Sequence, residues 1–194
     1  MNKENSIVET TLRLITSQGF HGSPMSQIAK EAGVAAGTIY HYFNNKNDLI
    51  RKVYKNVKKE MGEALMESYQ EGLDYRIQFG KFWHGLFVFF INNPLKFQFL
   101  EQFHHSPFIS EETQNESQVF YQPVLDFFFF FFQAGYLREM ELELISSIIY
   151  GNIVSVCNLH LNNELYINEK REKAAINASW DSIKNENIKQ DKYE

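Results

Sequence analysis

The chain has 194 residues, 44% hydrophobic and 22% charged, which is ordinary for a globular protein and leaves room for one or two domains. Its single cysteine, Cys157, excludes an internal disulfide and a cysteine-based metal cage. The longest apolar run, residues 127–132, is far shorter than the ~20 residues of a membrane span, and residues 1–6 lead directly into an amphipathic helix. We therefore expect no membrane association, no signal peptide and a cytoplasmic location.

Charge is distributed unevenly along the chain, whose formal net charge is −5. Residues 1–60 contain nine Lys or Arg and five Asp or Glu, which gives a net charge of +4. The remaining residues contain ten Lys or Arg and nineteen Asp or Glu, which gives a net charge of −9. A basic N-terminal third on an acidic body predicts that one end of the molecule binds phosphates.

Three short helices are predicted at the N-terminus. The first covers residues 4–18, and the second begins at Ser26, whose side chain we expect to cap it, and ends at Gly33. The third covers residues 36–43. Its Ile39 and Phe43 are four residues apart and face inward, which leaves polar and aromatic side chains outside. This pattern is typical of a helix-turn-helix whose second helix enters a DNA major groove.

The rest of the chain is also predicted to be helical, without a strand pattern, a repeat or a glycine-rich phosphate loop. The predicted helices cover residues 46–71, 74–92, 94–104, 111–134, 140–163 and 169–186, and the tail from Asn187 is expected to fray. The chain is therefore predicted to be all-α.

The run G-T-I-Y-H-Y-F at residues 37–43, followed by N-K-x-D-L at 45–49, resembles the TetR/AcrR family of transcription regulators. The likeness covers residues 7–59. It implies an N-terminal three-helix helix-turn-helix DNA-binding domain, residues 1–50, and a C-terminal helical dimerisation and effector-binding domain, residues 51–194. It also implies a homodimeric repressor, not an enzyme, that leaves its operator when a small molecule binds.

The same resemblance assigns roles around the third helix. Ala36 and Tyr40 would approach base edges, Thr38 would lie near a base or a phosphate, and Gly37 would allow close backbone approach. The residues that would hold phosphates are Ser26, His41, Tyr42 and Lys46. Packing against the scaffold is the alternative for Tyr40 and Tyr42, and a local cap is the alternative for Thr38.

The helix at residues 140–163 carries small residues every three or four positions, which permits close approach of another helix. These residues are Ser146, Ser147, Gly151 and Ser155. Because the helix is apolar around most of its circumference, we expect burial on two sides. With residues 116–134 it would form half of a four-helix dimer interface, as the resemblance implies; an intrachain core helix is the alternative.

Six consecutive phenylalanines at residues 127–132 sweep the whole circumference of a helix, so at least two rings must face solvent in a monomer. A dimer partner or a ligand chamber would cover them. We expect a small hydrophobic or aromatic effector, with ordinary core packing as the alternative for each candidate lining residue. The candidates are Trp83, Phe87, Phe103, His104, Tyr121, Phe128, Tyr150 and Cys157.

Two other functions stay open. Glu101 and His104 have the Glu-x-x-His spacing of di-iron helix bundles, with His105 beside them, but the chain has no second such pair, and we predict neither a metal nor a cofactor. A DNA-binding protein with a solid core and no ligand is the other possibility, and a measurable cavity would argue against it.

Overall fold

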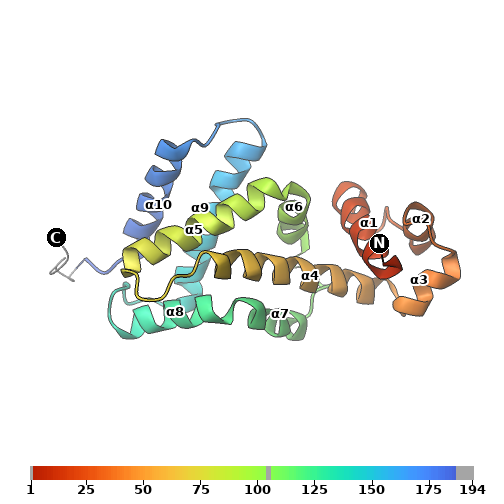
Figure 1. The fold of residues 1–194 in the computed structure, drawn as a ribbon, viewed down its shortest axis with the longest axis horizontal. Coiled ribbons are helices and arrows are strands. Elements are labelled where there is room, and N and C mark those ends of the chain that lie inside the picture. Colours follow the sequence, from red (N-terminus) through yellow and green to blue (C-terminus); the bar gives the residue numbers. More distant parts are fainter. Residues whose placement is uncertain (1, 104–105, 187–194) are drawn as a thin grey trace. The chain divides into compact units, whose positions relative to one another are not determined.

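The computed structural model describes residues 2–103 and 106–186, and this part of the chain is helical apart from turns and one isolated bridge between Leu137 and Lys184 (Figure 1). The prediction of an all-α fold is confirmed. The α-helices are α1 (Lys3–Gln18), α2 (Met25–Glu31), α3 (Ala36–Tyr42), α4 (Lys46–Glu67), α5 (Tyr75–Asn92), α6 (Pro94–Phe103), α7 (Glu111–Gln118), α8 (Gln122–Gln133), α9 (Leu142–Leu161) and α10 (Glu169–Ile183).

The chain forms two compact units, each made of two segments. Unit 1 consists of Met1–Met61 and Asn93–Phe120, and unit 2 consists of Gly62–Asn92 and Tyr121–Glu194. Helix α4 belongs to both units. The predicted functional division at residue 50 stays a prediction.

The core of unit 1 lies among α1, α2, α3 and α6, because α1 packs against the other three. Ile7 and Ile15 of α1, Ile28 of α2 and Ile39 of α3 are fully buried. Gly19 ends α1 with a φ of 73°, a value that glycine adopts without steric cost. The hydrophobic positions predicted for this region therefore form one small core that fixes α3.

In unit 2, helices α5, α9 and α10 pack against one another (Figure 1). Helix α5 supplies most of the buried aromatic surface, and its buried rings are Phe79, Phe82, Trp83, Phe87, Phe89 and Phe90. Burial of a side chain of this size contributes about 1.5–3 kcal/mol, so α5 is the central helix of this core.

Two predicted helices differ most from the observed ones. The helix expected over residues 111–134 is interrupted by a 3-10 turn, Val119–Tyr121, and resumes as α8 with Pro123 in its first turn. Proline has no amide hydrogen to continue a helix but fits the first turn of a new one. Helix α4 ends at Glu67 instead of residue 71, and the following loop turns at Gly72, which has a φ of 77°.

Helix α9 is buried along a single stripe, formed by Ile145, Ile153 and Cys157. The second buried side that we expected is not present within one chain. By length and composition α9 is the one helix in the described ranges that could cross a membrane, and only 17% of its most apolar window is buried. Gly151 has open space where a Cβ atom would lie. This face of α9 is thus available to another helix.

Candidate DNA-binding site

Helix α2 begins one residue earlier than the sequence indicated. Its N-cap is Pro24, and no side chain caps the first turn, so the prediction that Ser26 is the cap was wrong. Pro24 is already extended, with a ψ of 152°, and its carbonyl accepts the amides of Gln27 and Ile28 at 3.0 and 3.1 Å. Ser26 is exposed in the first turn of α2, which leaves its hydroxyl group accessible to a phosphate.

The turn between α2 and α3 is fixed by Gly33. This residue has a φ of 70°, and its amide bonds to the Lys30 carbonyl at 3.2 Å, while the Val34 amide bonds to the Ala29 carbonyl at 2.9 Å. These two hydrogen bonds make a Schellman motif, which requires a left-handed residue where glycine is favoured. The predicted end of α2 at Gly33 is confirmed.

Helix α3 separates a buried face from an exposed one. Ile39 is fully buried and Phe43, the C-cap residue, is 6% exposed, as predicted from their spacing. Tyr40 is 56% and Tyr42 39% exposed. His41, Ala36 and Gly37 are exposed too, and Thr38 is half-buried. The predicted reading residues therefore share the outer side of one helix.

Gly37 has no structural role within its own chain. Its φ is not positive, and a Cβ atom added to it would meet no heavy atom within 4 Å. A glycine inside a helix destabilises it by about 1 kcal/mol relative to alanine. Among the described residues nothing requires this glycine, and its close approach to DNA stays a prediction.

Lys46, the first residue of α4, faces the loop after α1. Its ammonium group donates a hydrogen bond to the Phe20 carbonyl and lies 4.2 Å from the centroid of the Phe20 ring. Burial lowers the pKa of Lys46. A phosphate contact by this lysine requires its release from Phe20, and its assignment to DNA stays a prediction.

Several basic residues of unit 1 are neutralised by neighbouring carboxylates. Arg13 pairs with Glu31 at 2.7 Å, and Lys52 pairs with Glu4 at 3.2 Å. Arg51–Asp48 and Lys55–Glu116 are further pairs. The net +4 of residues 1–60 already counts Glu4, Glu31 and Asp48, so among these pairs only Lys55–Glu116 brings in a carboxylate from outside that segment.

Lys30 is a candidate phosphate contact that the sequence analysis did not single out. It is exposed at the end of α2, and the structure gives it no ion pair among the described residues. Its position just before the turn into α3 was visible in the sequence, but its lack of a pairing carboxylate was not.

None of the described residues predicted to bind an effector lines the cavity found in unit 2. Trp83, Phe87, Phe103 and Cys157 are buried. Tyr121, Phe128 and Tyr150 are half-buried, and His104 lies outside the described residues. Their assignment as ligand contacts stays a prediction.

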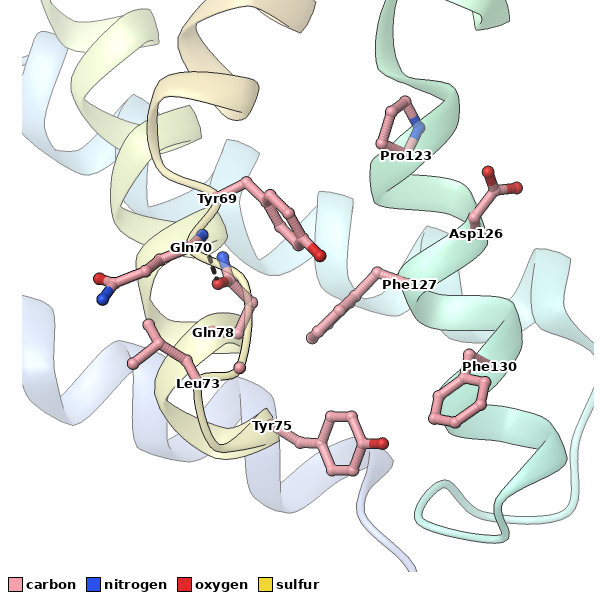
Figure 2. Close-up of a pocket in the computed structure, with 10 residues that line it drawn as sticks. Tyr69, Gln70, Leu73, Tyr75, Gln78, Pro123, Asp126, Phe127 and Phe130 are labelled. Atoms are coloured by element: carbon pink, nitrogen blue, oxygen red, sulfur yellow. Dashed lines mark hydrogen bonds between the residues drawn. The ribbon is translucent and has the colours of Figure 1, made fainter.

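A cavity of about 580 Å³ lies elsewhere in unit 2, between the loop that joins α4 to α5 and helix α8 (Figure 2). It is lined by Tyr69, Gln70, Gly72, Leu73, Tyr75, Gln78, Pro123, Asp126, Phe127 and Phe130. The six-phenylalanine run contributes two of these rings, and Phe129 and Phe130 are 54% and 58% exposed, which confirms that at least two rings face solvent.

The metal alternative concerned Glu101, His104 and His105, of which the two histidines lie outside the described residues. Within residues 2–103 and 106–186 no group of three or more His, Cys, Asp or Glu is arranged to hold a metal ion.

The helix-turn-helix and the helical body each match a known protein family. Residues 7–53 match the model of bacterial regulatory proteins of the tetR family, and residues 54–185 match a tetracyclin repressor-like C-terminal domain. The chain belongs to the TetR family. As a TetR-family protein it is a transcription regulator with a DNA-binding helix-turn-helix, not an enzyme.

Individual relatives agree with this assignment. This chain is 31% identical over 109 residues to an uncharacterised HTH-type transcriptional regulator of Haemophilus influenzae. The match spans 56% of this chain and 58% of that relative. A tetR family transcription regulator from Shewanella sp. PV-4 has a similar structure, with a TM-score of 0.88 and 26% identity over 95% of this chain and all of the other.

The transcriptional regulator FadR from Bacillus subtilis, solved in complex with stearoyl-CoA, superposes with a TM-score of 0.69 over 91% of this chain and 95% of its own. Its identity of 23% establishes a shared fold and does not extend to the ligand.

Proposed function

We propose that this TetR-family regulator is a cytoplasmic repressor that binds operator DNA as a homodimer and is released by a small apolar or aromatic effector. The outer side of α3 carries the DNA-binding part of the proposal. It presents Ala36, Gly37, Tyr40 and Tyr42 to solvent, and the fold itself does not require the glycine.

The side chains on the outer side of α3 can make few hydrogen bonds to base edges. Ala36 has no polar group, so its natural partner is the methyl group of thymine. Tyr40 offers a hydroxyl group to a base edge or a phosphate, and Lys30 offers a cation to the phosphate backbone. Affinity would then depend on phosphate contacts and fall as salt concentration rises.

The proposal of a homodimer is supported by the exposed surfaces of α8 and α9. Phe129 and Leu144 are about half exposed, at 54% and 49%. Ser147, Gly151 and Ser155 are exposed on α9 at spacings of four residues. An apolar helix with small residues on its open face fits a second copy of itself closely, and two reading helices in a symmetric dimer would bind a palindromic operator.

The cavity in unit 2 supports the proposal of an effector over that of a ligand-free DNA-binding protein. Its volume of about 580 Å³ is within the range of about 300–1,000 Å³ that is typical of small-molecule sites. We propose that the effector stabilises a conformation of α4 that no longer suits the operator. A coupling of about 1–3 kcal/mol between effector and operator would weaken operator binding roughly 5- to 150-fold.

The DNA-binding proposal is tested by selecting genomic fragments with the purified full-length protein and measuring their affinity by fluorescence anisotropy. Tyr40→Ala should weaken binding to the selected operator at least about 10-fold, the effect of losing about 1.4 kcal/mol. Tyr166→Ala is the matched control, since Tyr166 is 71% exposed in unit 2. Equal affinities for wild type and Tyr40→Ala would refute the role of α3.

A further inference from the structure

The cavity in unit 2 is dominated by aromatic rings. Tyr69 and Tyr75 come from the α4–α5 side, and Phe127 and Phe130 come from α8. Figure 2 shows the ring of Phe127 extending from α8 toward Tyr69 and Gln78 across the cavity. The faces of aromatic rings carry negative electrostatic potential, so a site built from them favours a positive charge.

These rings are held in place by their neighbours. Tyr69 stacks on Phe82 with centroids 6.2 Å apart, and Phe127 meets the same Phe82 edge-on at 5.1 Å. Tyr75 meets the buried Phe131 edge-on at 3.9 Å. The aromatic walls therefore exist before a ligand arrives, which reduces the entropy lost on binding.

The loop wall is fixed by Gln78, whose side chain is buried. Its Oε1 accepts a hydrogen bond from the amide of Gln70 at 2.9 Å (Figure 2). Its Nε2 donates to the Ser68 carbonyl at 3.0 Å. The Oε1 atom of Gln70 accepts a hydrogen bond from Lys81 at 3.0 Å. The amide oxygens on this side are thus already engaged and are poor candidates for ligand contacts.

The one charged side chain among the residues that line the cavity is acidic. Asp126 is the one ionisable carboxylate among the lining residues, and no lysine or arginine lines the cavity. Its Oδ1 accepts a hydrogen bond from Gln122 at 2.9 Å, and no ion pair neutralises it within the described part of the chain. Beyond the lining residues the charges are mixed, since Glu71 and Asp74 lie in the adjacent loop, Arg76 interacts with Asp74, and Lys81 donates to Gln70.

We propose that this cavity is the effector site and that its effector is an organic cation, with the apolar body among the four rings and the charge near Asp126. This inference rests on the proposed function and names the chemical class of its effector. It differs from a neutral apolar effector in requiring charge, and it disfavours coenzyme A esters, whose phosphates would face the carboxylates.

The test uses two ions of the same shape and opposite charge. Calorimetric titration of the full-length protein with tetraphenylphosphonium should give measurable binding, and tetraphenylborate should bind at least about 10-fold more weakly, a difference of about 1.4 kcal/mol. Equal binding of both ions, or stronger binding of the borate, would overturn the proposal.

Substitutions of the lining residues test where the cation binds. Asp126→Asn removes the carboxylate charge without changing its size and should weaken tetraphenylphosphonium binding several-fold. Phe130→Ala removes one lining ring and should weaken it too. Tyr166→Ala is the control, because Tyr166 is an exposed aromatic residue of unit 2 that does not line the cavity. Equal losses for Tyr166→Ala and Phe130→Ala would place the cation elsewhere and refute the site.

Operator binding separates this inference from the proposed function. Tetraphenylphosphonium should lower the operator affinity of the wild type and should do so less for Asp126→Asn. If the protein binds its operator and tetraphenylphosphonium does not change that affinity, the cation effector is refuted and the DNA-binding function stands. Failure to select any operator would refute the proposed function itself.

Discussion

Replacing Lys58 by methionine is expected to stabilise the protein. Lys58 lies on α4 within unit 1 and is only 8% exposed. Burial lowers its pKa from the ordinary value of 10.5 to about 8, because the charged ammonium group loses solvation in the fold. The folded state therefore binds the proton less tightly than the unfolded state does.

The sign and the size of the effect follow from this pKa difference. The unfolded chain binds more protons between pH 8 and 10.5, so the contribution of Lys58 to stability rises with pH in this window. At pH 7 its protonation destabilises the fold by about 3 kcal/mol, and at pH 9.5 by about half as much. Methionine removes this destabilisation together with every contact of the Lys58 ammonium group. One of these contacts is with the Tyr54 ring, 6.0 Å from Nζ, and is worth about 0.5–1 kcal/mol.

The assay is urea unfolding of wild type and Lys58→Met at pH 7.0 and 9.5. The variant should be more stable by about 2 kcal/mol at pH 7.0, and its advantage should shrink by a similar amount at pH 9.5. Lys59→Met is the control, since Lys59 is the adjacent exposed lysine, and it should change stability by less than about 0.5 kcal/mol. An advantage of Lys58→Met that is the same at both pH values would refute the pKa argument.

Three further substitutions test separate features. Gly37→Ala should raise the free energy of unfolding, measured by thermal denaturation, by about 0.5–1 kcal/mol. The same substitution should weaken operator binding measured by fluorescence anisotropy, and an unchanged affinity would contradict a close approach of DNA. Phe129→Glu should convert the dimer to monomers in sedimentation experiments, and a persistent dimer would move the interface away from α8. Ser179→Ala should stabilise unit 2 by about 1 kcal/mol in urea unfolding, because the buried Oγ has no hydrogen-bond partner among the described residues. A destabilised variant would indicate an ordered water there.

The local features of the helix-turn-helix were predictable because they depend on short-range chemistry. Gly33 ends α2 because a left-handed residue is required there, and Ile39 and Phe43 are buried because four residues span about one helical turn. The prediction that Ser26 caps α2 was wrong because Pro24 is already extended and its carbonyl oxygen accepts the amides of the first turn.

The cavity could not be predicted because its walls come from two segments, 69–78 and 123–130, that are 45 or more residues apart in the sequence. Tyr69 and Tyr75 flank a loop that the sequence assigned in part to α4, and Pro123 and Phe127 belong to a helix whose start was missed. The aromatic content pointed to a chamber, but ring positions depend on where these two helices end and begin.

The composition of unit 1 determines what a functional graft must contain. Its core is completed by α6, which packs on α1, and by Phe108, whose ring stacks on Phe20 with centroids 3.9 Å apart. A chimera that transfers the first fifty or sixty residues alone would therefore leave the apolar side of α1 facing foreign side chains. Transplanting the operator specificity of this protein onto another body requires two pieces, Met1–Met61 and Asn93–Phe120, or replacement of the residues on the outer side of α3 alone.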